Sequence, residues 1–293
     1  MSVIYSGQTI LNTTLDGSTQ TNFNQALVNA LISAGWSLVQ SGSSNGIWRV
    51  RSAATPQGLQ GDLWLYNGTA TSGTAPAVLM AASMLSTTNV GTSGYQNQSP
   101  VNIACGAGFT YQLIATGFYF YLVRTTIPCP SQSSYFWCAP YLPSNLTGLI
   151  SSFLIAYGST GGNDTLGSTG LFGSASGLPG MSGSFSYLNG AGHTGSSAWN
   201  LWGIVQFASG SGGYTPVAAT WFDGSVEFYE PRVMAYQTSS TGGQTGNQRA
   251  CGYMWDALVL YQALPRGTTI SYDSGTWLAI SENTTPTLLI KIA

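Results

Sequence analysis

The pattern of apolar and polar positions predicts one helix near the start of the chain, over about residues 22–34. The apolar residues that would share its inward face are Phe23, Leu27, Leu31 and Ala34. Thr21 or Asn22 could cap the first turn, while Gly35 suits the left-handed position just after the last one. Trp36 follows, in place for a hydrophobic contact with that turn. We therefore expect this helix to dock on a sheet through its leucine face.

After Trp36 the period changes to two, which is typical of short strands bounded by turn residues. The expected strands cover residues 37–40, 47–52, 62–66, 77–85, 109–115, 118–124, 199–207, 254–261, 268–272, 276–280 and 287–292. Turn signals are Asn45-Gly46, Asp223-Gly224 and Asp273-Ser274-Gly275. The strand at 118–124 is apolar on both faces, so it is buried on both sides or lies in a subunit contact. The predicted fold class is mainly β, an antiparallel sandwich or barrel-like body with the helix packed on the sheet.

Composition divides the chain into three parts. Residues 1–156 combine the helix with a β-rich body, and residues 215–293 form a C-terminal β segment that we expect to complete the same body. Between them, residues 157–214 are rich in Gly and Ser but carry scattered aromatic side chains. Trp199 and Trp202 argue against a free linker, so we expect an arm that neighbouring chains order, with both tryptophans at an interface.

Charge is scarce. The 293 residues include seven Lys and Arg and nine Asp and Glu, about 5% of the chain, whereas an ordinary soluble domain carries about 25%. Seven scattered cations make no basic stripe, so nucleic acid is not an expected partner. The apolar stretches are much shorter than the ~20 residues of a membrane-spanning helix. The N-terminal residues lack the pattern of a signal peptide, so secretion by that route is not expected.

Motifs for common chemistries are missing from the sequence. The single histidine, His193, lies in the Gly-rich part, and no Cys-x-x-Cys pair accompanies it, so we expect no metal site. Gly173-Ser174-Ala175-Ser176-Gly177 has alanine where a serine hydrolase would place its nucleophile. The one lysine, Lys291, is outside any phosphate-binding loop. We expect no cofactor and no catalytic residue.

Paired carboxylates are the remaining route to an enzyme, because glycoside hydrolysis needs only two of them across a sugar-binding cleft. Asp223 and Glu227 lie in an aromatic stretch with Trp221 and Tyr229, whose rings could stack on a sugar. The alternative, which we favour, is that Asp223 makes a turn and Glu227 lies on the solvent face of a strand, with Glu230 at its end.

The four cysteines are Cys105, Cys129, Cys138 and Cys251. Cys129 and Cys138 bracket a loop with flanking prolines and are candidates for a disulfide that would contribute on the order of 2.5–3 kcal/mol. Buried free thiols are an equal alternative.

Three arginines, Arg49, Arg51 and Arg124, fall on expected strands. In the strand at 47–52, alternation places Arg49 and Arg51 on one face and Trp48 and Val50 on the other. An arginine in so uncharged a chain is expected to form a bidentate pair with a carboxylate, within the fold or across an interface, or else to decorate an exposed strand.

Four segments carry a resemblance to a known class of proteins. They are Gln25 to Trp36, Ile47 to Ser52, Gly61 to Tyr66, and Tyr111 to Arg124. Together they resemble the first part of structural proteins of tailed-bacteriophage virions, in which a short helix ending in Gly-Trp precedes a β-rich body. The resemblance implies a tail, baseplate or neck component and brings no catalytic residue with it.

The sequence thus favours a non-enzymatic subunit that assembles with copies of itself and with other virion proteins. A weakly charged surface repels its neighbours little, which is consistent with such assembly. Two alternatives stay open. One is a receptor- or glycan-binding module at the tail tip with a host-surface glycan as partner, and the other is a carbohydrate-cleaving tail enzyme. The expected location is the virion.

Overall fold

The structure is a computed structural model. It describes residues 9–42, 46–56, 58, 60–67, 77–82, 101–103, 105–125, 135–141, 152–157, 199–202, 228–229, 232–238, 244–253, 255–260, 262, 264–280 and 287–293. In residues 77–82, 101–102, 135–141, 152–157, 199–202, 229, 232–238, 244–253 and 259, it describes the backbone alone.

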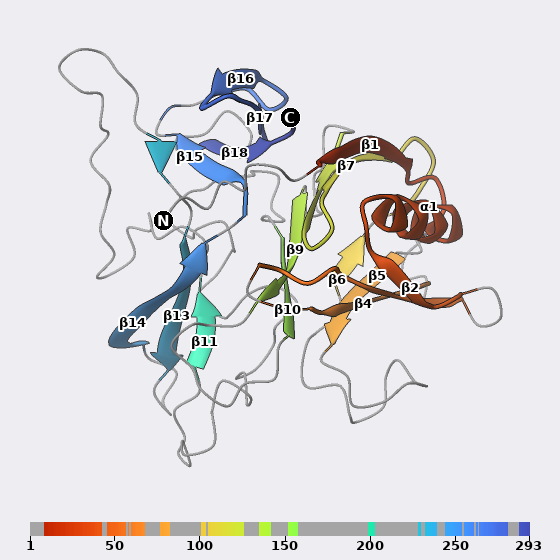
Figure 1. The fold of residues 1–293 in the computed structure, drawn as a ribbon, viewed down its shortest axis with the longest axis horizontal. Coiled ribbons are helices and arrows are strands. Elements are labelled where there is room, and N and C mark those ends of the chain that lie inside the picture. The colour runs from red at the N-terminus through yellow and green to blue at the C-terminus, as the bar shows by residue number, and fades with distance from the viewer. Residues whose placement is uncertain are drawn as a thin grey trace.

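The described residues are mainly β, with antiparallel strand pairing and one α-helix near the N-terminus (Figure 1), so the predicted fold class is confirmed. The β1 sheet has the order β1-β7-β8-β9-β10 and consists of Leu11–Asp16, Thr110–Ala115, Phe120–Arg124, Tyr135–Tyr141 and Ser152–Tyr157. The β2 sheet runs in sequence order from β2 to β6 and consists of Ser37–Gln40, Ile47–Arg51, Asp62–Asn67, Ala77–Ala82 and Val101–Ile103.

Two further sheets come from the second half of the chain. The C-terminal sheet has the order β12-β15-β18-β17-β16 and consists of Phe228–Tyr229, Ala257–Leu260, Thr287–Lys291, Gly275–Ala279 and Thr269–Tyr272. The third sheet has the order β11-β13-β14 and consists of Trp199–Trp202, Arg232–Thr238 and Gln244–Tyr253.

Helix α1 spans Gln20–Ser33 and begins earlier than predicted. The Oγ1 atom of Thr19 accepts a hydrogen bond from the backbone N–H of Asn22 at 3.2 Å, so Thr19 is the N-cap and the prediction of Thr21 or Asn22 was wrong. The end of the helix is as predicted. Gly35 has a φ of +104°, and the N–H of Trp36 bonds to the carbonyl of Leu31 at 3.0 Å.

One core joins α1 to the β1 and β2 sheets. The buried face of the helix consists of Phe23, Asn24, Leu27, Val28 and Leu31. The β2 sheet contributes Trp48, Val50, Leu63 and Leu65, and the β1 sheet contributes Leu15, Tyr111, Leu113, Phe120 and Leu122. Two sheets that share a core in this way, with a helix packed against both, match the sandwich-like arrangement expected from the sequence.

The strands expected at 109–115 and 118–124 are present as β7 and β8, which pair antiparallel. Every residue of β8 is buried, as its apolar pattern on both faces indicated. The strand lies between β7 and β9 in the β1 sheet. Other parts of the same chain bury β8 on both faces. Of the two explanations that the sequence offered, the structure therefore supports burial on both sides within the chain.

The C-terminal sheet curves around a second core made of Leu258, Leu260, Trp277, Ala279 and Leu289. The rings of Phe228 on β12 and Tyr272 on β16 have centroids 4.0 Å apart, so the two outer strands of this sheet lie close together. The predicted turn between β16 and β17 is confirmed. Asp273 and Ser274 have φ of +46° and +60°, the two positive values of a type I′ hairpin turn.

Candidate functional site

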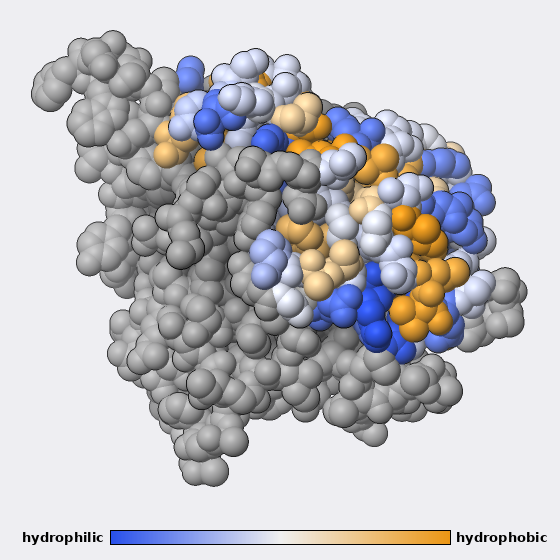
Figure 2. All heavy atoms as spheres, viewed as in Figure 1, coloured by the Kyte–Doolittle hydropathy of each residue, from blue (hydrophilic) through white to orange (hydrophobic). Residues whose placement is uncertain are grey.

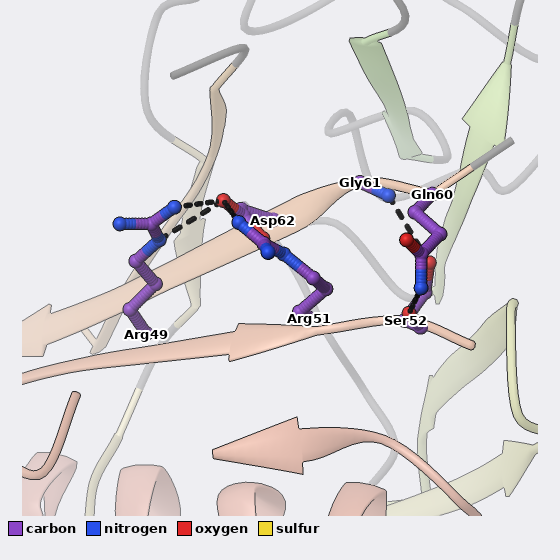
Figure 3. Close-up of polar contacts among 6 residues, drawn as sticks. All are labelled: Arg49, Arg51, Ser52, Gln60, Gly61 and Asp62. Atoms are coloured by element: carbon purple, nitrogen blue, oxygen red, sulfur yellow. Dashed lines mark hydrogen bonds and ion pairs between the residues drawn. The ribbon is translucent and has the colours of Figure 1, made fainter. Parts of the chain in front are cut away.

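The most highly charged cluster among the described residues lies between β3 and β4 (Figure 3). The antiparallel register places Arg51 directly opposite Asp62, and alternation places Arg49 on the same face two residues earlier. The Asp62 carboxylate accepts hydrogen bonds from both guanidinium groups. The Nε of Arg49 is 3.0 Å from Oδ2, and Arg49 Nη2 also contacts that oxygen. The Nε and Nη2 of Arg51 lie 2.7 and 3.1 Å from Oδ1 and Oδ2.

The two arginines of this ion-pair cluster have different exposure. The side chains of Arg49 and Asp62 are only 3% and 5% exposed, whereas that of Arg51 is 41% exposed. The guanidinium of Arg49 also lies 5.2 Å from the ring centroid of Trp64. The hydrogen bonds between Arg51 and Asp62 raise the pKa of Arg51, and burial opposes that rise. The predicted arginine–carboxylate pairing is therefore present within the chain for Arg49 and Arg51.

The β3–β4 ladder continues beyond the cluster into the connecting loop. Ser52 and Gly61 are linked by a backbone hydrogen bond of 3.0 Å, and the Gly61 N–H also bonds to the Ser52 hydroxyl at 3.1 Å. Gln60 Nε2 donates to the Ser52 carbonyl at 3.2 Å (Figure 3). These bonds hold Gly61 against Ser52, just before Asp62, which is the first residue of β4. The cluster thus lies within the β3–β4 hairpin, and its carboxylate accepts four hydrogen bonds.

Arg124, at the end of β8, has a different partner. Its guanidinium stacks on the ring of Phe109 with 3.9 Å to the centroid, and the residue is buried. Its backbone carbonyl accepts a hydrogen bond from the Nη2 of Arg266. An arginine stacked on an aromatic ring is an arrangement that the sequence analysis did not anticipate.

A buried polar seam joins β8 to the segment before β15. The Tyr119 hydroxyl donates to Oδ2 of Asp256 at 2.5 Å, and the Tyr121 hydroxyl donates to the carbonyl of Trp255 at 2.6 Å. The rings of Phe118 and Trp255 pack edge to face at 5.2 Å. Asp256 is completely buried and has a φ of +46°. This seam is where the C-terminal sheet is attached to the first half of the chain.

Burial is the main reason that the pKa of Tyr119 lies well above its ordinary value of 10.0, and the charge of Asp256 adds to it. The pKa of Tyr121 is raised well above 10.0 by the same two causes in the same order. Both phenols therefore stay protonated and able to donate. A catalytic acid or base must reach its substrate, and these three polar side chains are sealed from solvent. We assign the seam to stability.

The sequence analysis missed Asp256, Tyr119 and Tyr121. The available signal was one carboxylate inside an otherwise apolar stretch, Trp255-Asp256-Ala257-Leu258. That pattern indicates a buried charge but gives no partner, because the partner lies 137 residues earlier in the chain.

Several candidate residues from the sequence lie outside the described residues. They are Cys129, His193, Trp221, Asp223, Glu227 and Glu230. For Cys138, Trp199, Trp202 and Tyr229 only the backbone is described, on β9, β11 and β12. The disulfide, the tryptophan interface and the glycan site therefore stay predictions. Cys105 is buried and not in a disulfide, and its thiol donates to the carbonyl of Ile103 at 3.6 Å.

Four of the nine charged residues whose side chains are described are buried. Arg49, Asp62, Arg124 and Asp256 are buried, and Arg51, Arg266 and Lys291 are half-buried. Among the charged residues whose side chains are described, Asp16 and Asp273 are the exposed ones. Asp16 accepts hydrogen bonds from the backbone and hydroxyl of Ser18, and these bonds lower its pKa. The described exterior therefore carries only a few charges, from Asp16, Asp273 and the half-buried Arg51, Arg266 and Lys291.

Within the described part of the chain, no three His, Cys, Asp or Glu side chains gather closely enough to hold a metal ion. The helix in that part is too short to cross a membrane. No protein-family model matches this chain. A search of curated proteins also gives no significant match.

Proposed function

We propose that this chain is a non-enzymatic structural subunit of a tailed-bacteriophage virion, which assembles into a tail, baseplate or neck structure through protein–protein contacts. The observation that carries the proposal is the scarcity of charge on the described exterior, where Asp16 and Asp273 are exposed and Arg51, Arg266 and Lys291 are half-buried. The resemblance of the first 125 residues to virion structural proteins is the reason for naming a phage tail, baseplate or neck as the assembly.

A charge that is buried in a contact must lose its hydration, which costs several kcal/mol per ion unless a partner compensates for it. Protein interfaces are accordingly depleted of charged residues at their centres. A subunit that pairs its few charges internally, as Arg49 and Asp62 do, can bury its outer surface against neighbours at little electrostatic cost.

The exterior of the described region matches this argument. On the outer face of β1 the uncharged Asn12 and Thr14 are exposed beside one charged residue, Asp16. The exposed residues of β16 include Thr269 and Ser271. Such surfaces are hydrated in the free subunit. Removing them from water costs less free energy than removing ionised groups.

The test is localisation in the particle. Antibodies raised against the purified chain are expected to label tail or neck structures of particles made by the phage or prophage that encodes it, as seen by electron microscopy. Particles that carry no label, together with absence of the chain from their peptide mass spectra, would contradict the proposal.

The non-enzymatic part has its own test. Purified chain is expected to release no reducing ends from host-surface polysaccharide. Cleavage that disappears on the substitutions Asp223→Asn and Glu227→Gln would establish the enzyme alternative in its place.

A further inference from the structure

The ion-pair cluster between β3 and β4 carries one positive charge in excess. The guanidinium groups of Arg49 and Arg51 share the single carboxylate of Asp62. Residues 17–123 contain these three charged residues and no others, so α1, the β2 sheet and β7 supply no second carboxylate. The side chain of Arg49 is buried, whereas that of Arg51 is 41% exposed. The excess charge therefore faces solvent at Arg51.

Exposed apolar side chains lie beside this charge. The register pairs Arg51 with Ser37, and the next two residues of β2, Leu38 and Val39, are 48% and 43% exposed. Neighbouring strands are about 5 Å apart, so these side chains and the guanidinium share one stretch of surface. Figure 2 shows hydrophobic side chains over β2 next to strongly hydrophilic ones. We refer to Arg51, Leu38 and Val39 as the β2–β3 surface.

The turn between β16 and β17 presents the complementary groups. Residues 271–274 are all exposed. Tyr272, at 39%, is the one described large hydrophobic residue outside the region of α1 and β2 that is so exposed. The carboxylate of Asp273 forms no hydrogen bond or ion pair with any described residue, including Lys291 of the same sheet. The turn thus offers an available carboxylate directly after an exposed aromatic ring.

Asp16 is the other exposed acid among the described side chains, and it is the poorer candidate. Its Oδ1 accepts from the N–H of Ser18 and its Oδ2 from the Ser18 hydroxyl, each at 2.8 Å. An arginine bound there would compete with these bonds, whereas Asp273 would lose only its hydration.

The distribution of charge along the chain agrees with this choice. Residues 17–123 have a net charge of +1, from two arginines and one aspartate. Residues 157–293 contain seven Asp and Glu against four Lys and Arg, a net charge of −3. The region that holds Arg51 and the region that holds Asp273 are therefore complementary in charge.

The complementary groups belong to surfaces that do not meet within one chain. The described ion pair of Arg51 is with Asp62, and β2 and β16 lie in different parts of the molecule (Figure 1). A two-fold contact of the β2–β3 surface with itself would bring two Arg51 side chains together, and like charges oppose such a contact. A contact between the turn and the β2–β3 surface joins opposite charges instead.

We infer that the β16–β17 turn of one copy binds the β2–β3 surface of the next copy, with Asp273 against Arg51 and the ring of Tyr272 against the apolar side chains of β2. The inference rests on the proposed function, since it names one contact of an assembling subunit. An exposed ion pair contributes little alone, so the association is weak and sensitive to salt. Because the two surfaces differ, the contact repeats from copy to copy into a ring or a chain.

Sedimentation equilibrium of the full chain, from micromolar to near-millimolar concentration at low salt, measures this contact. The wild type is expected to form species larger than a dimer as the concentration rises, and to lose them when sodium chloride is added. Arg51→Gln and Asp273→Asn are each expected to weaken the association about two- to fivefold. Asparagine also suits the positive φ of this turn. The matched control, Asp16→Asn, removes the other exposed carboxylate and should leave the association unchanged.

A double-mutant cycle tests whether the two side chains meet. A chain with both Arg51→Gln and Asp273→Asn should associate no more weakly than either single variant, because both substitutions remove the same ion pair. Charge reversal separates the contact from folding. Chains with Arg51→Glu or Asp273→Lys should not associate alone but should associate when mixed, because every contact between unlike chains then joins opposite charges. Misfolded variants could not recover in this way.

The inference and the proposed function fail differently. A wild-type chain that stays monomeric, that stops at a dimer, or that associates equally well with Arg51→Gln or Asp273→Asn overturns the contact even where antibodies label the particle. A monomeric chain that needs Arg51 to bind another virion protein overturns the second copy as the partner. Unlabelled particles would overturn the virion assignment, while association that is lost and recovered by charge reversal still supports the contact.

Discussion

Replacing Asp62 by asparagine tests the central claim about the ion-pair cluster, that its carboxylate compensates a buried arginine. The substitution keeps the shape of the side chain but removes its charge, which leaves the Arg49 guanidinium, only 3% exposed, without a counter-ion. Removing one partner of a buried ion pair ordinarily costs about 3–5 kcal/mol. Since a whole domain is stable by roughly 5–15 kcal/mol, Asp62→Asn is expected to remove a large share of the stability.

The neighbouring arginine gives a matched control. Arg51 bonds to the same carboxylate, but its side chain is 41% exposed and water can replace Asp62 around it. Exposed ion pairs contribute about 0–1 kcal/mol, so Arg51→Gln is expected to cost little. The difference between the two variants isolates the effect of burial, because each removes a charge from the same cluster.

Urea unfolding followed by tryptophan fluorescence and by circular dichroism provides the measurement, since Trp64 lies against Arg49 and reports on this region. A third chain with Arg49→Met and Asp62→Leu replaces the buried pair by apolar side chains and should recover most of the loss. If Asp62→Asn costs less than about 1 kcal/mol, or no more than Arg51→Gln, the reasoning about an internally compensated charge is wrong.

The other predictions concern the buried seam and one close backbone approach. Tyr119→Phe removes the donor to Asp256 and is expected to cost about 1–3 kcal/mol in urea unfolding, and an unchanged midpoint would count against the bond. Because folding raises the pKa of Tyr119 and Tyr121, their contribution is constant below about pH 10 and decreases as the pH rises above it. The free energy of unfolding should therefore fall more steeply between pH 10 and 12 in the wild type than in a chain with both tyrosines changed to phenylalanine, and equal slopes would refute this. A Cβ on Gly42 would lie 2.1 Å from the ring of Trp48, which is itself buried, so Gly42→Ala should lower the thermal midpoint by several degrees, and an unshifted midpoint would contradict the packing.

Short-range features of this fold could be predicted from the sequence. The spacing of Phe23, Leu27 and Leu31 fixes the buried face of α1, and Gly35 marks its end, because both depend on residues within one or two helical turns. The start of the helix was harder to place. Thr19 competes with Thr21 and Asn22 as a cap, and the packing of the whole helix decides among residues of similar propensity.

The partners of the polar side chains could be predicted only in part. Alternation along β3 places Arg49 and Arg51 on one face, and a carboxylate partner follows from the cost of burying a charge alone. The choice of Asp62 depends on the register between β3 and β4, which the sequence did not specify. For Arg124 the nearby ring of Phe109 takes the guanidinium, which strand spacing does not reveal.

The scarcity of charge and the inward faces of the helix and strands follow from the order of residues along the chain. The positions of the charged groups and their partners depend on how the chain folds. Tyr119 and Asp256 meet across 137 residues, and no local pattern encodes a hydrogen bond between segments so far apart. The reason is energetic, since a buried carboxylate or guanidinium needs a partner that only the folded chain can bring to it. By pairing Arg49 with Asp62 and Tyr119 with Asp256 inside, the fold removes part of an already small number of charges from the described exterior.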